Sequence, residues 1–494
     1  MNDMSTIIIH ENQIKSEYIF SPGQNLFEFL REKGFAVDAP CGGHGLCGKC
    51  KVRLCADGRD DIVQACKITI NTDCTVYLSN NDSDLSWNAS ASSGIFEKGR
   101  TGYGAAVDLG TTTVALKLYD LSDGSCLGSI SEWNTQKTFG ADVITRIGFC
   151  IDNQSGLEIL SEAIRNQIKS MLSKLCGKHG VSVENVSEIV LAGNTVMQHI
   201  FVGISPNSIA AAPFTPATLF DDGKTYTLDG IPVYPAPCVA GYVGGDITAG
   251  ILCTGINERK GKALFIDVGT NGEMVLGDAD GMISCAVASG PAFEGAGISC
   301  GMPASFGAIN KVCLTDSGLE YEVLGGTEAE GICGSGLLDL AACLLELGYI
   351  DESGILEEDE NGEAIFRLNE KVYITQKDIR QLQLAKAAVA AGIKRLMQTE
   401  ELSFDDINAL YLAGGFGNRL RPESAVKIGM LPKDMLGKIY SAGNTSLSGA
   451  EEALLSPSSR EKLSKIKANC RYIELSSDEN FSELFIDEMY FPEE

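Results

Sequence analysis

Alternating apolar and polar positions predict two similar β-hairpins in the middle of the chain. Residues 107–119 and residues 266–276 each combine a short apolar strand, a tight turn rich in glycine and polar residues, and a second strand. The two turns carry an aspartate, a glycine and a threonine at matching positions: Asp108, Gly110 and Thr111, and then Asp267, Gly269 and Thr270. Backbone N–H groups in such a turn can hold phosphate oxygens, and the carboxylate can anchor a hydrated divalent cation. One copy would be ordinary turn chemistry, whereas two copies that each open a lobe-sized segment favour phosphate binding.

A second repeated pattern follows each hairpin in the same order. A buried strand runs into a glycine turn at residues 191–195 and again at residues 412–416. Two pairs of repeats in the same order predict two duplicated α/β halves, and the cleft between such halves suits a nucleotide. Glycine turns before helices add further candidates for nucleotide contact: Gly334, Ser335, Gly414 and Gly415. Close packing of a helix on a strand is the alternative explanation for these glycines.

The N-terminal part of the chain has a different pattern, which predicts a small separate module. Residues 6–9 and 18–20 are typical of paired strands, and residues 25–32 are typical of a short helix. Four cysteines follow at the spacing C-x5-C-x2-C-x15-C, namely Cys41, Cys47, Cys50 and Cys66. Thiolates are the natural ligands of iron–sulfur clusters, and the glycines between the first three cysteines let the backbone wrap closely around sulfur.

The cysteine set leaves two points open. Four cysteines can also form a closed tetrahedral zinc site, although zinc ribbons usually pair two C-x2-C knuckles and this chain has only one. The fourth ligand is expected to be Cys66, with Cys55 and Cys74 as nearby alternatives.

Small polar residues fill the stretch from 83 to 102, which predicts a flexible linker. The expected organisation is a cysteine-rich module at 1–82, the linker at 83–102, a first lobe at 103–260 and a second lobe at 261–494. A redox module on a flexible tether could move between an electron donor and an acceptor.

The charge balance argues against two classes of partner. Lys and Arg together number 39 against 66 Asp and Glu, and the net charge of −27 disfavours nucleic acid and anionic membrane surfaces. We find no run of 18 apolar residues and no basic leader, so we expect neither a membrane span nor a signal peptide. Seventeen cysteines without an export signal predict a reducing compartment, which we expect to be the cytoplasm.

These motifs resemble two known folds joined in one chain. Residues 4–82 resemble a ferredoxin-type [2Fe-2S] domain, and residues 103–453 resemble the ATPase superfamily of sugar and acetate kinases, heat-shock chaperones and actin. The combination resembles the reductive activators of corrinoid proteins. The implied fold class is α+β and multidomain, with an N-terminal β-grasp ferredoxin-like domain followed by a duplicated two-lobe α/β actin-like ATPase fold.

The resemblance also implies an activity. Such activators use ATP to return inactive Co(II) to Co(I) in a methyltransferase system, delivering one electron from a [2Fe-2S] cluster. The implied partners are a corrinoid protein and a low-potential electron donor, and the implied cofactors are the cluster, ATP and Mg2+. The implied roles are cluster ligation by Cys41, Cys47, Cys50 and Cys66, catalysis at Asp108 and Asp267, and nucleotide binding at Gly110, Thr111, Gly269, Thr270, Gly334, Ser335, Gly414 and Gly415.

Three other functions stay open at this point. One is an ATP-driven activator of a radical acyl-CoA dehydratase, another is a small-molecule kinase with a redox sensor, and the third is a nucleotide-gated binding protein without enzymatic activity. The oligomeric state is also left open by the sequence.

Overall fold

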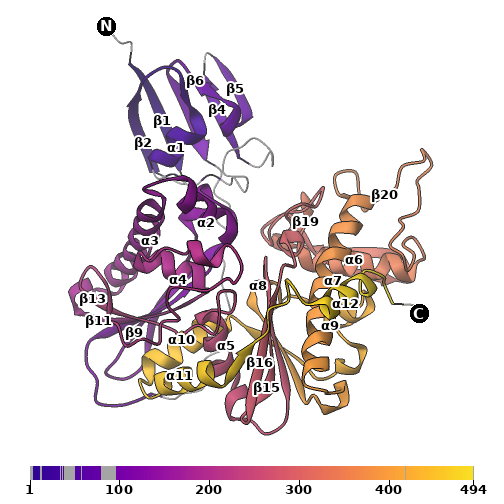
Figure 1. The fold of residues 1–494 in the computed structure, drawn as a ribbon. Coiled ribbons are helices and arrows are strands. Elements are labelled where there is room, and N and C mark those ends of the chain that lie inside the picture. The colour runs from indigo at the N-terminus through magenta and orange to yellow at the C-terminus, as the bar shows by residue number, and fades with distance from the viewer. Residues whose placement is uncertain are drawn as a thin grey trace. The chain divides into compact units, whose positions relative to one another are not determined.

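Figure 1 shows the computed structural model, which describes residues 4–11, 14–33, 35, 37, 50–56, 58–78, 96–417 and 419–492. Contacts group these residues into two compact units, which are described separately. The N-terminal unit contains the described residues up to Pro235, and the C-terminal unit contains those from Ala236 onward. Among the described residues, no helix combines the length and apolar character needed to cross a bilayer.

The first part of the N-terminal unit is a five-stranded sheet with one short helix. The strand order is β2-β1-β7-β4-β5, in which β1 pairs antiparallel with β2 and parallel with β7. The helix buries four apolar side chains against this sheet, and Asn25 caps its N-terminus by accepting from the Glu28 N–H at 3.2 Å. This is the predicted β-grasp arrangement. The elements are β1 (Ser5–Glu11), β2 (Ile14–Phe20), β3 (Gln24–Asn25), α1 (Leu26–Glu32), β4 (Lys51–Ala56), β5 (Arg59–Gln64), β6 (Thr69–Ile70) and β7 (Cys74–Leu78).

The second part of the N-terminal unit is a six-stranded sheet of order β10-β9-β8-β11-β13-β12. The long helix α3 buries an apolar stripe on it that includes Ile164, Ile168 and Met171. The elements are β8 (Tyr103–Leu109), β9 (Thr113–Asp120), β10 (Cys126–Trp133), α2 (Val143–Asp152), α3 (Gly156–His179), β11 (Val186–Gly193), α4 (Thr195–Val202), β12 (Tyr226–Leu228) and β13 (Ile231–Pro235).

The C-terminal unit is built on a six-stranded sheet of order β23-β22-β14-β15-β16-β24. Its strands are β14 (Ala263–Val268), β15 (Gly272–Asp278), β16 (Gly281–Val287), β22 (Ala409–Ala413), β23 (Ile439–Gly443) and β24 (Cys470–Tyr472). Two smaller sheets contain β17 (Ala308–Thr315), β18 (Gly318–Val323), β19 (Gly331–Ile332), β20 (Ile365–Arg367) and β21 (Tyr373–Thr375). The helices are α5 (Gly245–Thr254), α6 (Gly334–Glu346), α7 (Gln376–Thr399), α8 (Gly414–Gly417), α9 (Pro422–Lys427), α10 (Thr445–Leu455), α11 (Ser459–Asn469) and α12 (Glu479–Asp487).

The two large sheets share one topology, which confirms the predicted duplication. In each, the third, second and first strands of the half pair antiparallel, the fourth strand lies parallel to the first, and one further strand, β13 or β23, lies parallel to the fourth. The order β10-β9-β8-β11-β13 in one unit therefore corresponds to β16-β15-β14-β22-β23 in the other. Both predicted hairpins are present, as β8–β9 and β14–β15.

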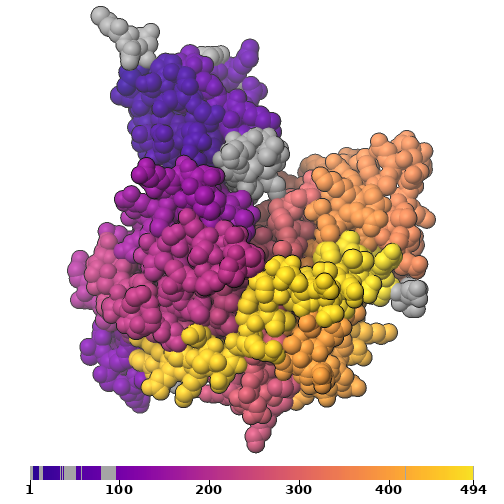
Figure 2. Space-filling view, in the orientation of Figure 1, coloured from indigo at the N-terminus to yellow at the C-terminus, as the bar shows by residue number. Residues whose placement is uncertain are grey.

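The C-terminal segment packs onto helices of its own unit, as Figure 2 shows in yellow against orange. The Gln383 side-chain amide on α7 donates to the Met489 carbonyl at 2.7 Å, and Lys394 on the same helix forms an ion pair with Glu488. These contacts anchor the chain end beside α7.

The expected linker lies largely outside the described residues. Its last part, residues 96–102, contacts the N-terminal unit, because Arg100 pairs with Glu188 and the Gly102 carbonyl accepts from the Leu121 N–H at 2.9 Å. The first lobe predicted from the sequence, residues 103–260, includes helix α5. In the structure, the contacts of α5 place it in the C-terminal unit. The domain limits drawn from the sequence stay a prediction.

Candidate functional site

The first hairpin turn lies in the N-terminal unit between β8 and β9. A side chain at Gly110 would overlap the Thr113 carbonyl, so the turn can be this tight only with glycine. Asn134 donates from its side chain to the Gly110 carbonyl at 2.8 Å and from its backbone to the Thr112 carbonyl at 2.9 Å. Asp108 is half-buried on β8, two residues before Gly110.

The strand-to-helix turn of the same unit lies against this hairpin. Gly193 pairs with Leu109 at the end of β11, and a Cβ at Gly193 would lie 2.8 Å from the Leu109 carbonyl oxygen. Asn194 caps α4 and donates from its side-chain amide to the Thr111 hydroxyl at 3.0 Å. In this half, the glycine turn at residues 191–195 therefore contacts the hairpin turn at Gly110 and Thr111.

The second hairpin turn lies in the C-terminal unit and is held from one side by a short loop. The Thr270 hydroxyl donates to Glu294 Oε1 at 3.0 Å, and the Ser289 hydroxyl donates to the Gly269 carbonyl at 3.0 Å. Within the turn, the Gly269 N–H donates to the Asn271 carbonyl at 2.8 Å.

Three carboxyl groups gather at this second turn. Glu273 stands opposite Asp267 in the register of β14 and β15, and Asp246 comes from the first turn of α5. Burial raises the pKa of Glu273 well above its usual range, and the charges of Asp246 and Asp267 raise it further. Mutual repulsion of this kind is relieved by a divalent cation, whose preferred ligands are carboxylate oxygens. Mg2+ takes one or two carboxylates besides water and phosphate oxygens, so two of these groups suit it, although the described residues contain no group of three that could hold a metal ion together.

The glycine turn after β22 lies directly against Asp267. Gly414 has a φ of +80°, and a Cβ at this position would overlap Asp267 Oδ1. Gly415 follows it in α8, and Phe416 stacks on Phe293 with ring centroids 4.6 Å apart.

The turn that opens α6 reaches the same loop. A side chain at Gly334 would overlap the Phe293 carbonyl, and Phe293 lies in the 3-10 helix η6 (Pro291–Glu294) beside Glu294. The Ser335 hydroxyl donates to the Asn310 carbonyl at 2.8 Å, which gives that side chain a structural hydrogen bond. Loop η6 therefore lies against Gly269, Thr270 and Gly334, and it stacks on Phe416 in the turn of Gly414 and Gly415. Asp267 lies against Gly414, and Ser335 binds Asn310 instead.

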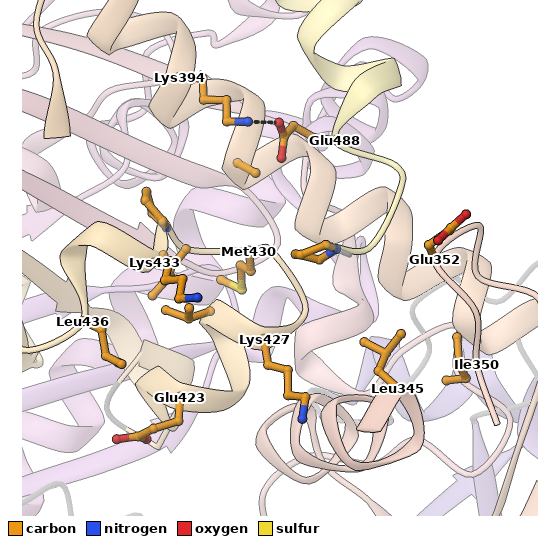
Figure 3. A pocket seen from close by; sticks show the side chains of 16 residues that line it. Leu345, Ile350, Glu352, Lys394, Glu423, Lys427, Met430, Lys433, Leu436 and Glu488 are labelled. Carbon is orange, nitrogen blue, oxygen red and sulfur yellow. Dashed lines mark hydrogen bonds and ion pairs between the residues drawn. The ribbon is translucent and has the colours of Figure 1, made fainter. Parts of the chain in front are cut away.

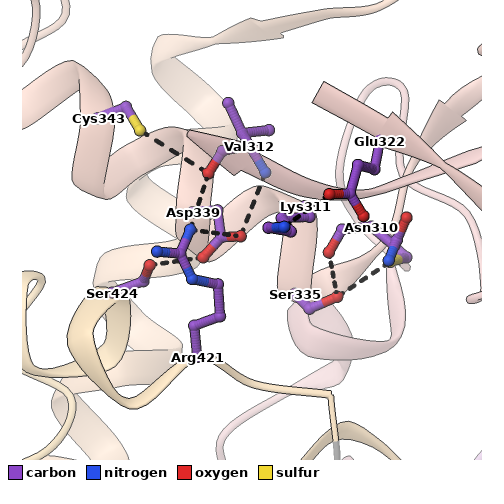
Figure 4. A network of polar contacts seen from close by, with 10 residues as sticks. Asn310, Lys311, Val312, Glu322, Ser335, Asp339, Cys343, Arg421 and Ser424 are labelled. Carbon is purple, nitrogen blue, oxygen red and sulfur yellow. Dashed lines mark hydrogen bonds and ion pairs between the residues drawn. The ribbon is translucent and has the colours of Figure 1, made fainter. Parts of the chain in front are cut away.

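A buried polar network ties helix α6 to helix α9 (Figure 4). Asp339 on α6 accepts from the Ser424 hydroxyl at 2.5 Å and from the Val312 N–H at 3.2 Å, and Arg421 lies 3.6 Å away. Because α6 follows the Gly334 turn and α9 follows the Gly414 turn, this network limits independent movement of the two glycine turns.

Cys50 and Cys66 are brought together at one end of the N-terminal sheet, with sulfur atoms 3.2 Å apart. Two ligands of one tetrahedral metal ion lie about 3.8 Å apart when each bond is about 2.3 Å, so this pair can share an iron after a small movement. Cys55 is five residues further along β4, about 16 Å away in extended chain, and Cys74 begins β7 opposite Ala56. Cys41 and Cys47 lie outside the described residues, and no group of three possible metal ligands occurs among the described ones.

A cavity of about 570 Å3 in the C-terminal unit lies apart from these residues (Figure 3). Side chains of both charges line it, including Lys394, Lys433, Glu423 and Glu488, together with apolar residues such as Met430. It includes none of the candidate residues.

Several residues of the site were not predicted from the sequence. Asp246 resembles any acidic residue in the first turn of a helix, where it also favours the helix dipole. Glu294 and Asn134 reach their turns only through tertiary packing. Of these residues, Glu273 was the easiest to find from the sequence, because it follows the second hairpin turn directly, at the start of β15.

The fold is that of an actin-like ATPase preceded by a β-grasp, ferredoxin-like domain, and comparisons with known proteins agree. Residues 103–259 match the family described as "RACo middle region", and residues 261–494 match "C-terminal domain of RACo the ASKHA domain". A solved structure called "Reductive activator for corrinoid,iron-sulfur protein" is 31% identical, with a TM-score of 0.72 over 99% of this chain and 98% of that one.

Two curated relatives carry related names. The corrinoid activation enzyme RamQ of Eubacterium limosum is 33% identical over 79% of this chain and 70% of its own length. The "[Co(II) methylated amine-specific corrinoid protein] reductase" of Methanosarcina barkeri is 27% identical over 79% of this chain and 77% of its own length. The chain belongs to the family of reductive activators of corrinoid proteins, which confirms the resemblance inferred from its motifs.

Replacing Gly414 by alanine should displace the Asp267 carboxylate, because the new methyl group would overlap Oδ1. We expect affinity for Mg2+-ATP to fall by on the order of tenfold, measured by titration calorimetry. Gly437→Ala is the matched control, because Gly437 has a φ of +90° but nothing within 4 Å of a Cβ. Equal losses in the two variants would mean that backbone strain, and not the carboxylate, sets the effect.

Glu273→Gln should stabilise the protein near neutral pH when no divalent cation is present. The pKa of Glu273 is higher in the folded than in the unfolded protein. Its contribution to the free energy of unfolding is therefore fully present below pH 4.5 and is lost as pH rises through the folded-state pKa. The amide cannot ionise, so the stability gain of the variant should grow in thermal melts as pH rises above 4.5. Added Mg2+ should reduce the gain, and a pH-independent difference would contradict this assignment.

Proposed function

We propose that this chain uses ATP to drive the reduction of a partner's corrinoid from Co(II) to Co(I), as an activator in a methyltransferase system. The observation that carries the proposal is the close approach of Gly414 to Asp267 beside the hairpin turn that carries Thr270, in a chain whose relatives are named for corrinoid activation. Family membership favours this function over the dehydratase activator and the small-molecule kinase.

In this proposal the hairpin turns and their carboxylates bind the nucleotide and its metal. Asp246 and Asp267 would hold Mg2+, and proximity of the cation would favour loss of the Glu273 proton. The turns at Gly110 and Thr111 and at Gly269 and Thr270 would direct N–H groups to phosphate oxygens. Asp108 takes the matching position in the first half.

The N-terminal module would hold the electron carrier. A [2Fe-2S] cluster bound there supplies a single electron at low potential. Cys50 and Cys66 would ligate it together with Cys41 and Cys47, and the paired sulfur positions of the first two support that assignment. The Asn25 side-chain amide donates to the Cys66 carbonyl at 2.9 Å, which fixes the peptide that carries this thiol. Zinc at the same cysteines would have no redox chemistry and does not suit the proposed activity.

Coupling to ATP is needed because the electron moves uphill. A gap of about 300 mV corresponds to about 7 kcal/mol for one electron. A nucleotide can supply this only by binding differently to two states of the activator with its corrinoid partner. A low-potential donor would reload the N-terminal module after each turnover, and the division at 1–82, 83–102, 103–260 and 261–494 would separate carrier, tether and ATPase lobes.

The direct test is an anaerobic mixture of this protein with a Co(II) corrinoid protein, a reductant and ATP. The wild-type protein should generate the Co(I) absorption band only when ATP is present. Asp267→Ala should slow its appearance by on the order of 100-fold while leaving the visible absorption of the cluster intact. Asp280→Ala is the matched control, since Asp280 is an exposed acid at the other end of β15. ATP-independent reduction by the wild-type protein would refute the proposal.

A second test addresses the cluster ligands. Cys66→Ser should lose or alter the cluster, because serine replaces a thiolate beside Cys50. Cys55→Ser should keep the iron and sulfide content of the wild-type protein, because this residue lies further along β4. An unchanged visible spectrum in Cys66→Ser, with loss in Cys55→Ser, would move the fourth ligand to Cys55.

A further inference from the structure

Arg146 is a fully buried arginine on α2 whose side chain reaches the back of the first hairpin turn. Its Nη2 donates to the Thr111 carbonyl at 2.6 Å, and its Nε donates to the Gly140 carbonyl at 3.0 Å. The remaining terminal nitrogen, Nη1, donates to Gln136 Oε1 at 3.1 Å and to Met197 Sδ at 3.0 Å. One guanidinium therefore joins the hairpin turn, the loop at residues 136–140 and helix α4 to helix α2.

All four acceptors of this guanidinium are neutral. Burial lowers the pKa of Arg146 to about 9, against a smaller opposing effect of Asp142, so the side chain is a cation at pH 7. Among the residues that the structure describes, no carboxylate forms an ion pair with it. A buried charge without a direct counter-ion is unfavourable, and an anion bound nearby would offset part of that penalty.

The three carbonyl groups of the first hairpin turn all accept hydrogen bonds from other parts of the N-terminal unit. Asn134 binds the carbonyls of Gly110 and Thr112, and Arg146 binds that of Thr111. A trans peptide directs the next N–H opposite to each carbonyl, so the N–H groups of Thr111 and Thr112 face away from these donors. Neither N–H has a protein acceptor within the described part of the chain. Adjacent N–H groups of this kind bind anions.

An aspartate precedes both turns, Asp108 in the first and Asp267 in the second, but the second turn, in the C-terminal unit, has further carboxyl groups around it. Thr270 contacts Glu294, and Asp246 and Asp267 act on the neighbouring Glu273. The duplicated turns have therefore diverged, with a buried cation behind the first and carboxyl groups around the second.

We propose that Arg146 is a positioning residue for the terminal phosphates of ATP, acting through the first hairpin turn. The hydrogen bond from Arg146 fixes the Thr111 carbonyl, so that the N–H groups of Thr111 and Thr112 face away from the guanidinium and are free to bind an anion. The guanidinium also places a positive charge close to these N–H groups. The first turn then receives oxygens of the β- and γ-phosphates. This inference rests on the proposed ATP-binding function and assigns one part of it to Arg146.

The test compares the affinities of ATP and AMP, measured by titration calorimetry with saturating Mg2+. AMP lacks the β- and γ-phosphates, so Arg146→Met should weaken ATP binding by on the order of tenfold or more and AMP binding much less. Arg146→Lys keeps the charge but cannot reach all four acceptors, so it should retain more of the preference for ATP than Arg146→Met. Lys386→Met is the control, because it removes a buried cation on α7 in the other unit and should leave the preference unchanged.

Each outcome of this experiment decides the role of Arg146. A selective loss for ATP, partly restored by lysine, supports the proposal. Equal losses of affinity for ATP and AMP would overturn the proposal. Wild-type affinity for ATP in both Arg146 variants would overturn it as well. If Arg146→Met does not fold, as judged by its thermal melt, the ATP preference of Arg146→Lys gives the answer, and no change from wild type refutes the proposal. Failure of the wild-type protein to bind ATP at all would instead refute the proposed function.

Discussion

The close approach of the Gly414 backbone to the Asp267 carboxylate is the constraint on which the candidate site in the C-terminal unit depends. It follows from sheet register, because β14 and β22 run parallel with Asp267 opposite Ala413, so the next residue must turn beside the carboxylate. Only a residue without a side chain fits there at positive φ. The Asp267 carboxylate is thereby held at the end of β14, where its charge and that of Asp246 raise the pKa of Glu273.

Duplication explains why both units build such a site, and the packed neighbours explain why the two sites differ. The same strand order brings a glycine turn beside a hairpin turn in each unit, through Gly193 in one and Gly414 in the other. What lies behind each hairpin turn comes from elements outside the shared five strands: α2 supplies Arg146, and η6 supplies Glu294. The repeated frame conserves backbone geometry, while these inserted elements set the local charge.

Local pattern was sufficient to predict two duplicated α/β halves, both hairpins and the glycine turns, because each depends on residues close together in sequence, and the family resemblance supplied the fold class. It could not predict Asp246, Glu294 or Arg146, whose contacts form only after distant segments pack. The choice among the candidates for the fourth cysteine ligand shows the same limit. Cys55 is nearer than Cys66 to Cys50 in sequence, yet β4 carries Cys55 away, and its antiparallel partner β5 returns the chain beside Cys50.

Loop η6 gives the C-terminal unit a physical route by which a nucleotide could influence more than its own binding turn. Glu294 contacts the hairpin turn through Thr270, while the neighbouring Phe293 touches both the Gly334 turn and Phe416. The Asp339 network then joins the helices that follow those two turns. A ligand can shift a conformational equilibrium only through differential affinity, and a loop shared by three turns makes their positions interdependent. Movement of one of these turns must therefore be accommodated by the other two.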